Sequence, residues 1–235
     1  MQIKIRPKDE RGEAELGWLH ARYTFSFADY HDPNHLGFRS LKVMNNDVIE
    51  PGGGFATHHH QNMEIFTYIE KGSLEHKDSM GNESVLSEGQ LQYMSAGHGV
   101  QHSEFNTSKD RQTELYQIWL QPNHQGGSPR YKEIDVQSRT PSNDLRILFS
   151  GSGRDDSIII RQDAEISIVE LTAGRSMAIT ADLLFPFGWV QLISGTLMVE
   201  GKQLNKADGI AIEDWVKELE FLAREDSKFL LFRLQ

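Results

Sequence analysis

The sequence contains no cysteine among its 235 residues. Disulfide bonds and thiolate metal sites are therefore excluded, because both require cysteine sulfur. Any metal ion in this protein must be held by histidine, aspartate or glutamate side chains.

Long apolar runs and an excess of positive charge are also missing. No stretch of about 18 apolar residues occurs, so we expect neither a transmembrane helix nor membrane binding. Residues 1–6 do not lead into an apolar run, so we expect no signal peptide and a cytoplasmic location. The net charge of −10 repels phosphate backbones, which argues against direct nucleic-acid binding but permits a protein partner. We expect a monomer.

Glycine is frequent (20 residues) and separates short runs rich in β-branched and aromatic residues. This pattern is typical of an all-β fold. Residues 23–27 alternate large apolar and small polar side chains and predict a strand, and residues 41–44 predict another, followed by a turn at 45–47. Residues 211–224 fit either a helix or strands, and we favour strands because their surroundings are β-rich.

The domain organisation follows from a change of composition and from a weak internal repeat. Residues 122–144 hold three prolines and many polar residues, which predicts a linker or crossover. We therefore expect one domain over 1–125 and another over 126–235, with the boundary within 122–144 and the extreme termini free to pack on the other domain. All ten histidines lie at or before position 124, so only the first domain can hold a histidine-based metal site.

Two histidine motifs lie about forty residues apart in the first domain. His58 and His60 would share one face of a strand and His59 the other, because side chains alternate along a strand. By the same period His102 and Glu104 share a face. Together they offer three imidazole nitrogens and one carboxylate oxygen, a set that suits Fe(II), Mn, Cu, Ni or Zn. Glu64 could be a further ligand, or could hydrogen-bond a ligating histidine.

These motifs resemble those of the cupin superfamily. Residues 52–72 approximate its first motif, a glycine followed by HxH and a glutamate, and residues 89–106 approximate its second, with Ser95 where proline is usual. The departures match one family: the chain resembles a bacterial pirin of the type described as quercetin 2,3-dioxygenases. Residues 17–120 carry the resemblance, in particular Gly54-Phe55-x-x-His58-x-His60, Met63-Glu64, Glu75-His76-x-Asp78-Ser79-x-Gly81-Asn82 and His102-Ser103-Glu104.

The resemblance implies a fold and a metal centre. It implies two cupin (double-stranded β-helix) barrels packed face to face, with few short helices and with metal only in the first. The implied ligands of one divalent transition metal are His58, His60, His102 and Glu104, and Glu64 is then not a ligand. Fe(II) is the first expectation for the metal, with Mn, Cu, Ni, Co or Zn as alternatives.

The resemblance also implies an activity. The protein would be an O2-dependent oxidoreductase that opens the heterocyclic ring of flavonols such as quercetin and releases carbon monoxide. Glu104 would act as the catalytic base that takes the substrate's hydroxyl proton. The pocket for a small aromatic substrate would use Phe55, Met63, Phe66 and Met94. The alternative is a non-catalytic pirin that senses metal or redox state and regulates a protein partner; a cupin enzyme with another substrate is a third hypothesis.

Overall fold

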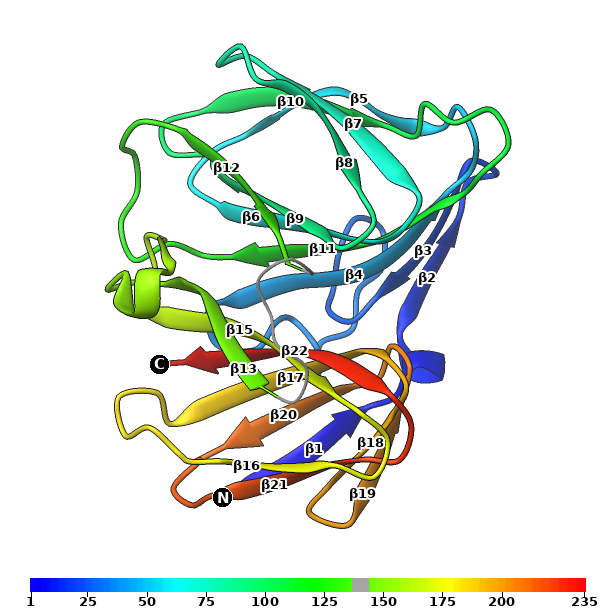
Figure 1. Cartoon of the computed structure of the whole chain (residues 1–235). Helices are drawn as coiled ribbons and strands as arrows, with labels where there is room; N and C mark the ends of the chain where they lie inside the picture. The colour runs from blue at the N-terminus through cyan, green and yellow to red at the C-terminus, as the bar shows by residue number, and fades with distance from the viewer. Residues whose placement is uncertain (137–143) are drawn as a thin grey trace. The chain divides into compact units, whose positions relative to one another are not determined.

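The computed structural model describes residues 1–136 and 144–235, so residues 137–143 of the expected boundary region lie outside the described residues. Its contacts divide the chain into two compact units (Figure 1). Gly12–Gly37 and Leu41–Ser138 form the unit that we call the N-terminal barrel. Met1–Arg11, Phe38–Ser40 and Arg139–Gln235 form the C-terminal barrel. The first eleven residues thus belong with the second half of the chain.

Two antiparallel sheets build the N-terminal barrel. A seven-stranded sheet has the order β12-β9-β6-β11-β4-β3-β2, and a four-stranded sheet has the order β5-β10-β7-β8. The strands are β2 (Gly12–Glu15), β3 (Leu19–Tyr23), β4 (Leu41–Ile49), β5 (Gly54–His60), β6 (Glu64–Lys71), β7 (Ser73–Asp78), β8 (Glu83–Ser87), β9 (Gln90–Ser95), β10 (Val100–Phe105), β11 (Thr113–Leu120) and β12 (Arg130–Asp135).

The C-terminal barrel repeats this arrangement of a seven-stranded and a four-stranded sheet. Their orders are β1-β20-β17-β22-β15-β13-β14 and β16-β21-β18-β19. The elements are β1 (Gln2–Arg6), η1 (Lys8–Glu10), β13 (Asp144–Ser150), η2 (Arg154–Asp156), β14 (Ile158–Ile159), β15 (Ala164–Leu171), β16 (Ser176–Ile179), β17 (Phe187–Ser194), β18 (Thr196–Val199), β19 (Lys202–Asn205), β20 (Gly209–Glu213), β21 (Leu219–Ala223) and β22 (Ser227–Leu234).

The prediction of an all-β protein with two cupin barrels is confirmed. In the described ranges the only helices are the two three-residue 3-10 turns η1 and η2. Residues 209–213 and 219–223 are strands, as predicted. None of the described helices is long or apolar enough to span a bilayer. The expected face-to-face packing of the barrels stays a prediction.

Two local predictions near the start of the chain are wrong. The strand expected over residues 23–27 ends at Tyr23, and Phe27 instead forms an isolated bridge with Tyr30. The turn expected at 45–47 does not exist, because β4 runs through these residues to Ile49. Pairing with β3 and β11 on either side keeps this polar segment extended, which overrides its turn-like composition.

The interiors of the two barrels differ in kind. The C-terminal barrel is filled by one large apolar cluster that includes Trp215, Phe221 and Phe229. The described residues of the N-terminal barrel include smaller apolar clusters, one around Leu19 and Ile69 and one around Ile65 and Met94. Between its two sheets the N-terminal barrel keeps a cavity, and the four predicted metal ligands line it.

Candidate metal centre

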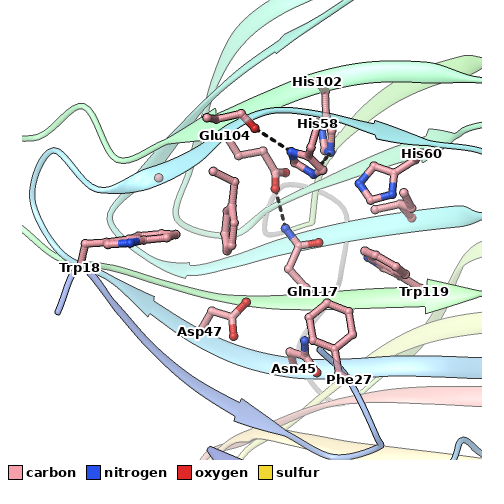
Figure 2. Close-up of a pocket in the computed structure, with 14 residues that line it drawn as sticks. Trp18, Phe27, Asn45, Asp47, His58, His60, His102, Glu104, Gln117 and Trp119 are labelled. Carbon is pink, nitrogen blue, oxygen red and sulfur yellow. Dashed lines mark hydrogen bonds between the residues drawn. The ribbon is translucent and has the colours of Figure 1, made fainter. Parts of the chain in front are cut away.

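Strand β5 presents alternate histidines to the cavity. His58 and His60 line the cavity, whereas the exposed side chain of His59 does not (Figure 2). The strand lies close against β10, and a Cβ atom on Gly54 would stand 2.4 Å from the backbone oxygen of Glu104. Only glycine therefore allows this approach.

Strand β10 brings the third histidine opposite the first. His102 pairs with His58 across the antiparallel β5–β10 ladder, and the two Nε2 atoms are 3.0 Å apart. The ring centroids of His58, His60 and His102 are separated by 4.4 to 4.9 Å. One nitrogen from each ring lies within 4.8 Å of the others, so the fold assembles a three-histidine group from two strands.

The three imidazoles suit a metal ion. Burial and the neighbouring histidines lower the pKa of His60 to about 3 and that of His102 to about 3, so both rings are neutral at pH 7. His58 donates from Nδ1 to the carbonyl oxygen of Ala56 over 2.8 Å, which leaves Nε2 as the ring nitrogen that faces His102. Two nitrogens bound to one ion at roughly 2.1 Å and at a right angle lie roughly 3.0 Å apart, as these two do.

Glu104 lies beside this group but belongs to a second one. Its ligand atoms cluster with those of His76 and His102. Gln117 donates to Oε2 of Glu104 over 2.7 Å, and Thr67 donates to Oε1 over 3.3 Å. Burial raises the pKa of Glu104, and the nearby histidines and the Thr67 hydrogen bond only partly oppose this rise.

His76 is occupied by other partners, which separates the two groups chemically. The buried carboxylate of Asp78 accepts from Nε2 of His76 over 3.1 Å, and Gln92 donates to its Nδ1 over 3.0 Å. Neither ring nitrogen then has a lone pair for a metal. Of the two groups, the one formed by His58, His60 and His102 is therefore the better metal site.

The cavity beside the three histidines has a volume of about 480 Å³, which is the size range of small-molecule pockets. His58, His60, His102 and Glu104 come from the four-stranded sheet, and the seven-stranded sheet supplies most of the opposite wall (Figure 2). No lysine or arginine is among the described residues that line it. The full lining is Trp18, Phe27, Asn45, Asp47, Gly54, Phe55, Ala56, His58, His60, Ile65, His102, Glu104, Gln117 and Trp119.

Of the five further candidates from sequence, only Phe55 lines the cavity. Ile65 of β6 faces the cavity, so Glu64 and Phe66 on either side of it point to the other face of the sheet. There Glu64 accepts hydrogen bonds from Tyr93 (2.6 Å) and Ser95 (2.5 Å), and Phe66 stacks on Tyr93. Met94 and Met63 pack in an apolar cluster beside the pocket.

Several lining residues were not identified from the sequence. Trp119 packs edge-on against His60 and Phe27, with ring centroids 4.9 and 5.5 Å away. Trp18 meets Phe55 edge-on at 5.1 Å. Trp18 precedes β3 and Phe27 follows it, so neither lies on a strand whose pattern would show its direction. Trp119 lies on β11, and Gln117, two residues earlier, shares its face. The alternation of β11 could therefore have predicted that both side chains point inward.

Comparison with known families accounts for most of the chain. Residues 4–120 match the family described as Pirin, and residues 147–234 match the quercetinase C-terminal cupin domain. The chain is 39% identical over 242 residues to quercetin 2,3-dioxygenase of Escherichia coli (strain K12), with 99% of this chain and 98% of the relative covered. It is 36% identical over 232 residues to a pirin-like protein of Caulobacter vibrioides, covering 97% and 98%.

A solved structure shows the same fold over the same length. The bacterial pirin YhhW from Escherichia coli in complex with nickel(II) superposes with a TM-score of 0.93 at 39% identity. The alignment covers 99% of each chain.

Proposed function

This chain belongs to the pirin family of cupin proteins, and from that premise we propose that it is a metal-dependent dioxygenase. It opens the heterocyclic ring of flavonols such as quercetin with O2 and releases carbon monoxide. One observation carries the proposal: three histidines from two strands face a cavity walled by aromatic side chains. The names of the related quercetin 2,3-dioxygenases support it.

The metal ligands in this proposal are His58, His60, His102 and Glu104. The nickel(II) complex of a pirin 39% identical to this chain supports a divalent transition metal. Fe(II) is our first choice, and Mn, Cu, Ni, Co or Zn fit the same donor set. When bound, the metal supplies Lewis acidity that lowers the pKa of a substrate hydroxyl and fixes the substrate's orientation.

Glu104 is the proposed catalytic base. Its raised pKa brings the carboxyl group closer to neutrality, which favours accepting a proton from the 3-hydroxyl of the flavonol at Oε1 or Oε2. Gln117 and Thr67 hold both carboxylate oxygens in place before the proton moves. Because Glu104 is 2% exposed, bulk water does not compete for that proton.

The aromatic walls select a flat substrate. Trp18, Phe27, Phe55 and Trp119 offer ring faces and edges on which a flavonol ring system can pack. Since no described lining residue is a lysine or arginine, phosphate and carboxylate substrates have no cationic partner there beyond the metal. The cavity thus fits a neutral aromatic molecule with hydroxyl groups.

The test is an aerobic assay of protein reconstituted separately with Fe, Mn, Cu, Ni and Co. Loss of the flavonol absorbance of quercetin together with carbon monoxide in the headspace is expected with at least one metal. The Glu104→Gln variant keeps the shape but not the base, and we expect it to bind quercetin while turnover falls at least 100-fold. Absence of turnover with every metal contradicts the proposal.

A further inference from the structure

Asn45, like His102 and Trp119, is a residue of the cavity lining that has a buried polar atom without a hydrogen-bond partner in the described part of the protein. Asn45 is 2% exposed and lines the cavity, and its Oδ1 has no hydrogen-bond partner in the described part of the protein. It lies on β4, where Asn46 points the other way and donates to the backbone oxygen of Leu115. A buried amide oxygen without a partner destabilises the fold, so its retention calls for a reason.

The neighbouring polar groups do not supply that partner. Asn45 pairs with Gln117 across β4–β11, and Gln117 pairs with Thr67 across β11–β6, so the three side chains form a row on the inner face. Gln117 donates to Glu104 (2.7 Å) and lies 3.4 Å from Thr67 Oγ1, so its amide is already engaged. Gln117 and Thr67 of this row hydrogen-bond to Glu104, the proposed base. Asn45, at the other end of the row, has an amide oxygen that a ligand can engage.

Asn45 and its neighbour Asp47 offer hydrogen-bond acceptors to a ligand. Asp47 follows two residues later on the same face of β4, lines the cavity and is 3% exposed. Burial, together with the charge of Asp47, raises the pKa of Tyr23 on the neighbouring strand. A carboxylate and an amide oxygen both accept hydrogen bonds, and no described cationic side chain lines the cavity to attract an anion.

We propose that Asn45, with Asp47 beside it, binds a hydroxyl group on the substrate ring that is remote from the metal. Figure 2 shows Asn45 and Asp47 on the wall opposite the histidines, with Gln117 and Trp119 between them. The substrate class is then polyhydroxylated flavonols rather than flavonols in general. This inference rests on the proposed function, and it makes Asn45 a residue that sets specificity.

The experiment compares two ligands that share one metal-binding edge. Quercetin and 3-hydroxyflavone both carry the 3-hydroxyl and 4-carbonyl groups, and only quercetin has hydroxyls elsewhere. Their affinities are measured anaerobically on nickel(II)-loaded protein by absorbance. We expect the intact protein to bind quercetin at least about tenfold more tightly. Asn45→Leu should reduce that preference to within about twofold without weakening 3-hydroxyflavone, and the matched control Asn46→Leu should leave it unchanged.

Each outcome decides between the two proposals. Equal affinity for the two ligands in the intact protein, or an unchanged preference in Asn45→Leu, overturns the inference while the proposed function stands. If neither flavonol binds, the proposed function fails. The nitrogen-15-labelled protein is then titrated with catechol and with benzene, and the side-chain amide signal of Asn45 is followed. A shift with catechol alone upholds the hydroxyl subsite, and no shift overturns it.

Discussion

The two barrels share one frame and differ in what fills it. Asn106 exchanges backbone hydrogen bonds with Gly52 and Gly53, and Ala223 makes the same pair with Gly174 and Arg175. The ladders counted from these bonds match once one extra residue of β5, at the register shift between His102 and Glu104, is skipped. They align His58 with Ile179, His76 with Val199, His102 with Leu219 and Glu104 with Phe221.

The seven-stranded sheets show the same exchange. Each has one irregularity in its central ladder, between Glu114 and Leu115 and between Leu192 and Ser194. Counting from these aligns Thr67 with Val190, Gln117 with Leu231 and Asp47 with Val169. All seven C-terminal counterparts belong to the large apolar cluster. The frame therefore tolerates either interior, and the metal centre depends on side chains at matched positions.

The largest effect is expected when a metal ligand of the N-terminal barrel is replaced by the residue at the matching position of the C-terminal barrel. His102→Leu gives this position the same residue as its counterpart Leu219. We expect the variant to lose its bound metal, because only two of the three imidazoles remain. Metal content is measured after dialysis, and far-ultraviolet circular dichroism should show the fold intact. As a control, Leu219→Ala should keep its metal but lower the free energy of unfolding by about 2 to 5 kcal/mol. Full metal retention in His102→Leu would show that the ligand assignment is wrong.

A smaller effect is expected one step away from the metal. Gln117→Leu adopts the side chain of Leu231 and removes the 2.7 Å hydrogen bond that holds Glu104. We expect metal affinity or kcat to fall about 10- to 100-fold, as for other residues that orient ligands. Thr67→Val removes a longer bond of 3.3 Å and should cost less. Metal affinity is measured by competition with a chromophoric chelator. Equal losses in the two variants would contradict the expectation that Gln117 matters more than Thr67.

The histidine pattern explains why part of the site could be predicted. His58 and His60 are two residues apart, as are His102 and Glu104, so the members of each pair share a face wherever the motif forms a strand. What the sequence lacks is the pairing of β5 with β10 and β7, since long-range register is not encoded in local pattern. For that reason His76 could not be placed beside His102 and Glu104.

The remaining cavity residues were hidden by their local context. Asn45 and Asp47 sit in a segment whose composition favours a turn, and only pairing on both sides makes it a strand. Phe27 follows the end of β3, where tertiary contacts with Tyr23 and Trp119 place its ring. The apolar character of Phe66 predicts a pocket residue, but the two-residue period of β6 turns its side chain to the opposite face.

A third prediction concerns pH and the metal-free protein. The pKa of His102 is about 3 when folded and near its ordinary value of 6.5 when unfolded. Below pH 6.5 the unfolded chain therefore binds a proton at His102 that the folded chain does not. The contribution of His102 to the free energy of unfolding is therefore highest above pH 6.5 and falls as the pH is lowered toward 3.

His102→Leu removes this titrating imidazole and leaves Glu104 in place. Unfolding of the variant should take up about one proton fewer between pH 6 and 4, which changes the unfolding equilibrium up to about tenfold per pH unit. Urea titrations of both proteins at several pH values measure this. Parallel pH profiles would mean that His102 is not held neutral by burial. Phe221→Leu in the C-terminal barrel should leave the proton uptake unchanged, since it removes no titrating group.

The smallest effect is expected from the middle of the three consecutive histidines. His59 is exposed and does not line the cavity, so His59→Ala should change the free energy of unfolding by less than about 0.5 kcal/mol and leave the metal content unchanged. His58→Ala, one residue earlier, should lose metal, because its Nε2 faces that of His102 at 3.0 Å. The pair differs only in the face of β5 on which the side chain lies. If His59→Ala lost metal and His58→Ala kept it, the register assigned to β5 would be wrong by one residue. This result would also break the alignment of His58 with Ile179, because a one-residue slip exchanges the two faces of a strand.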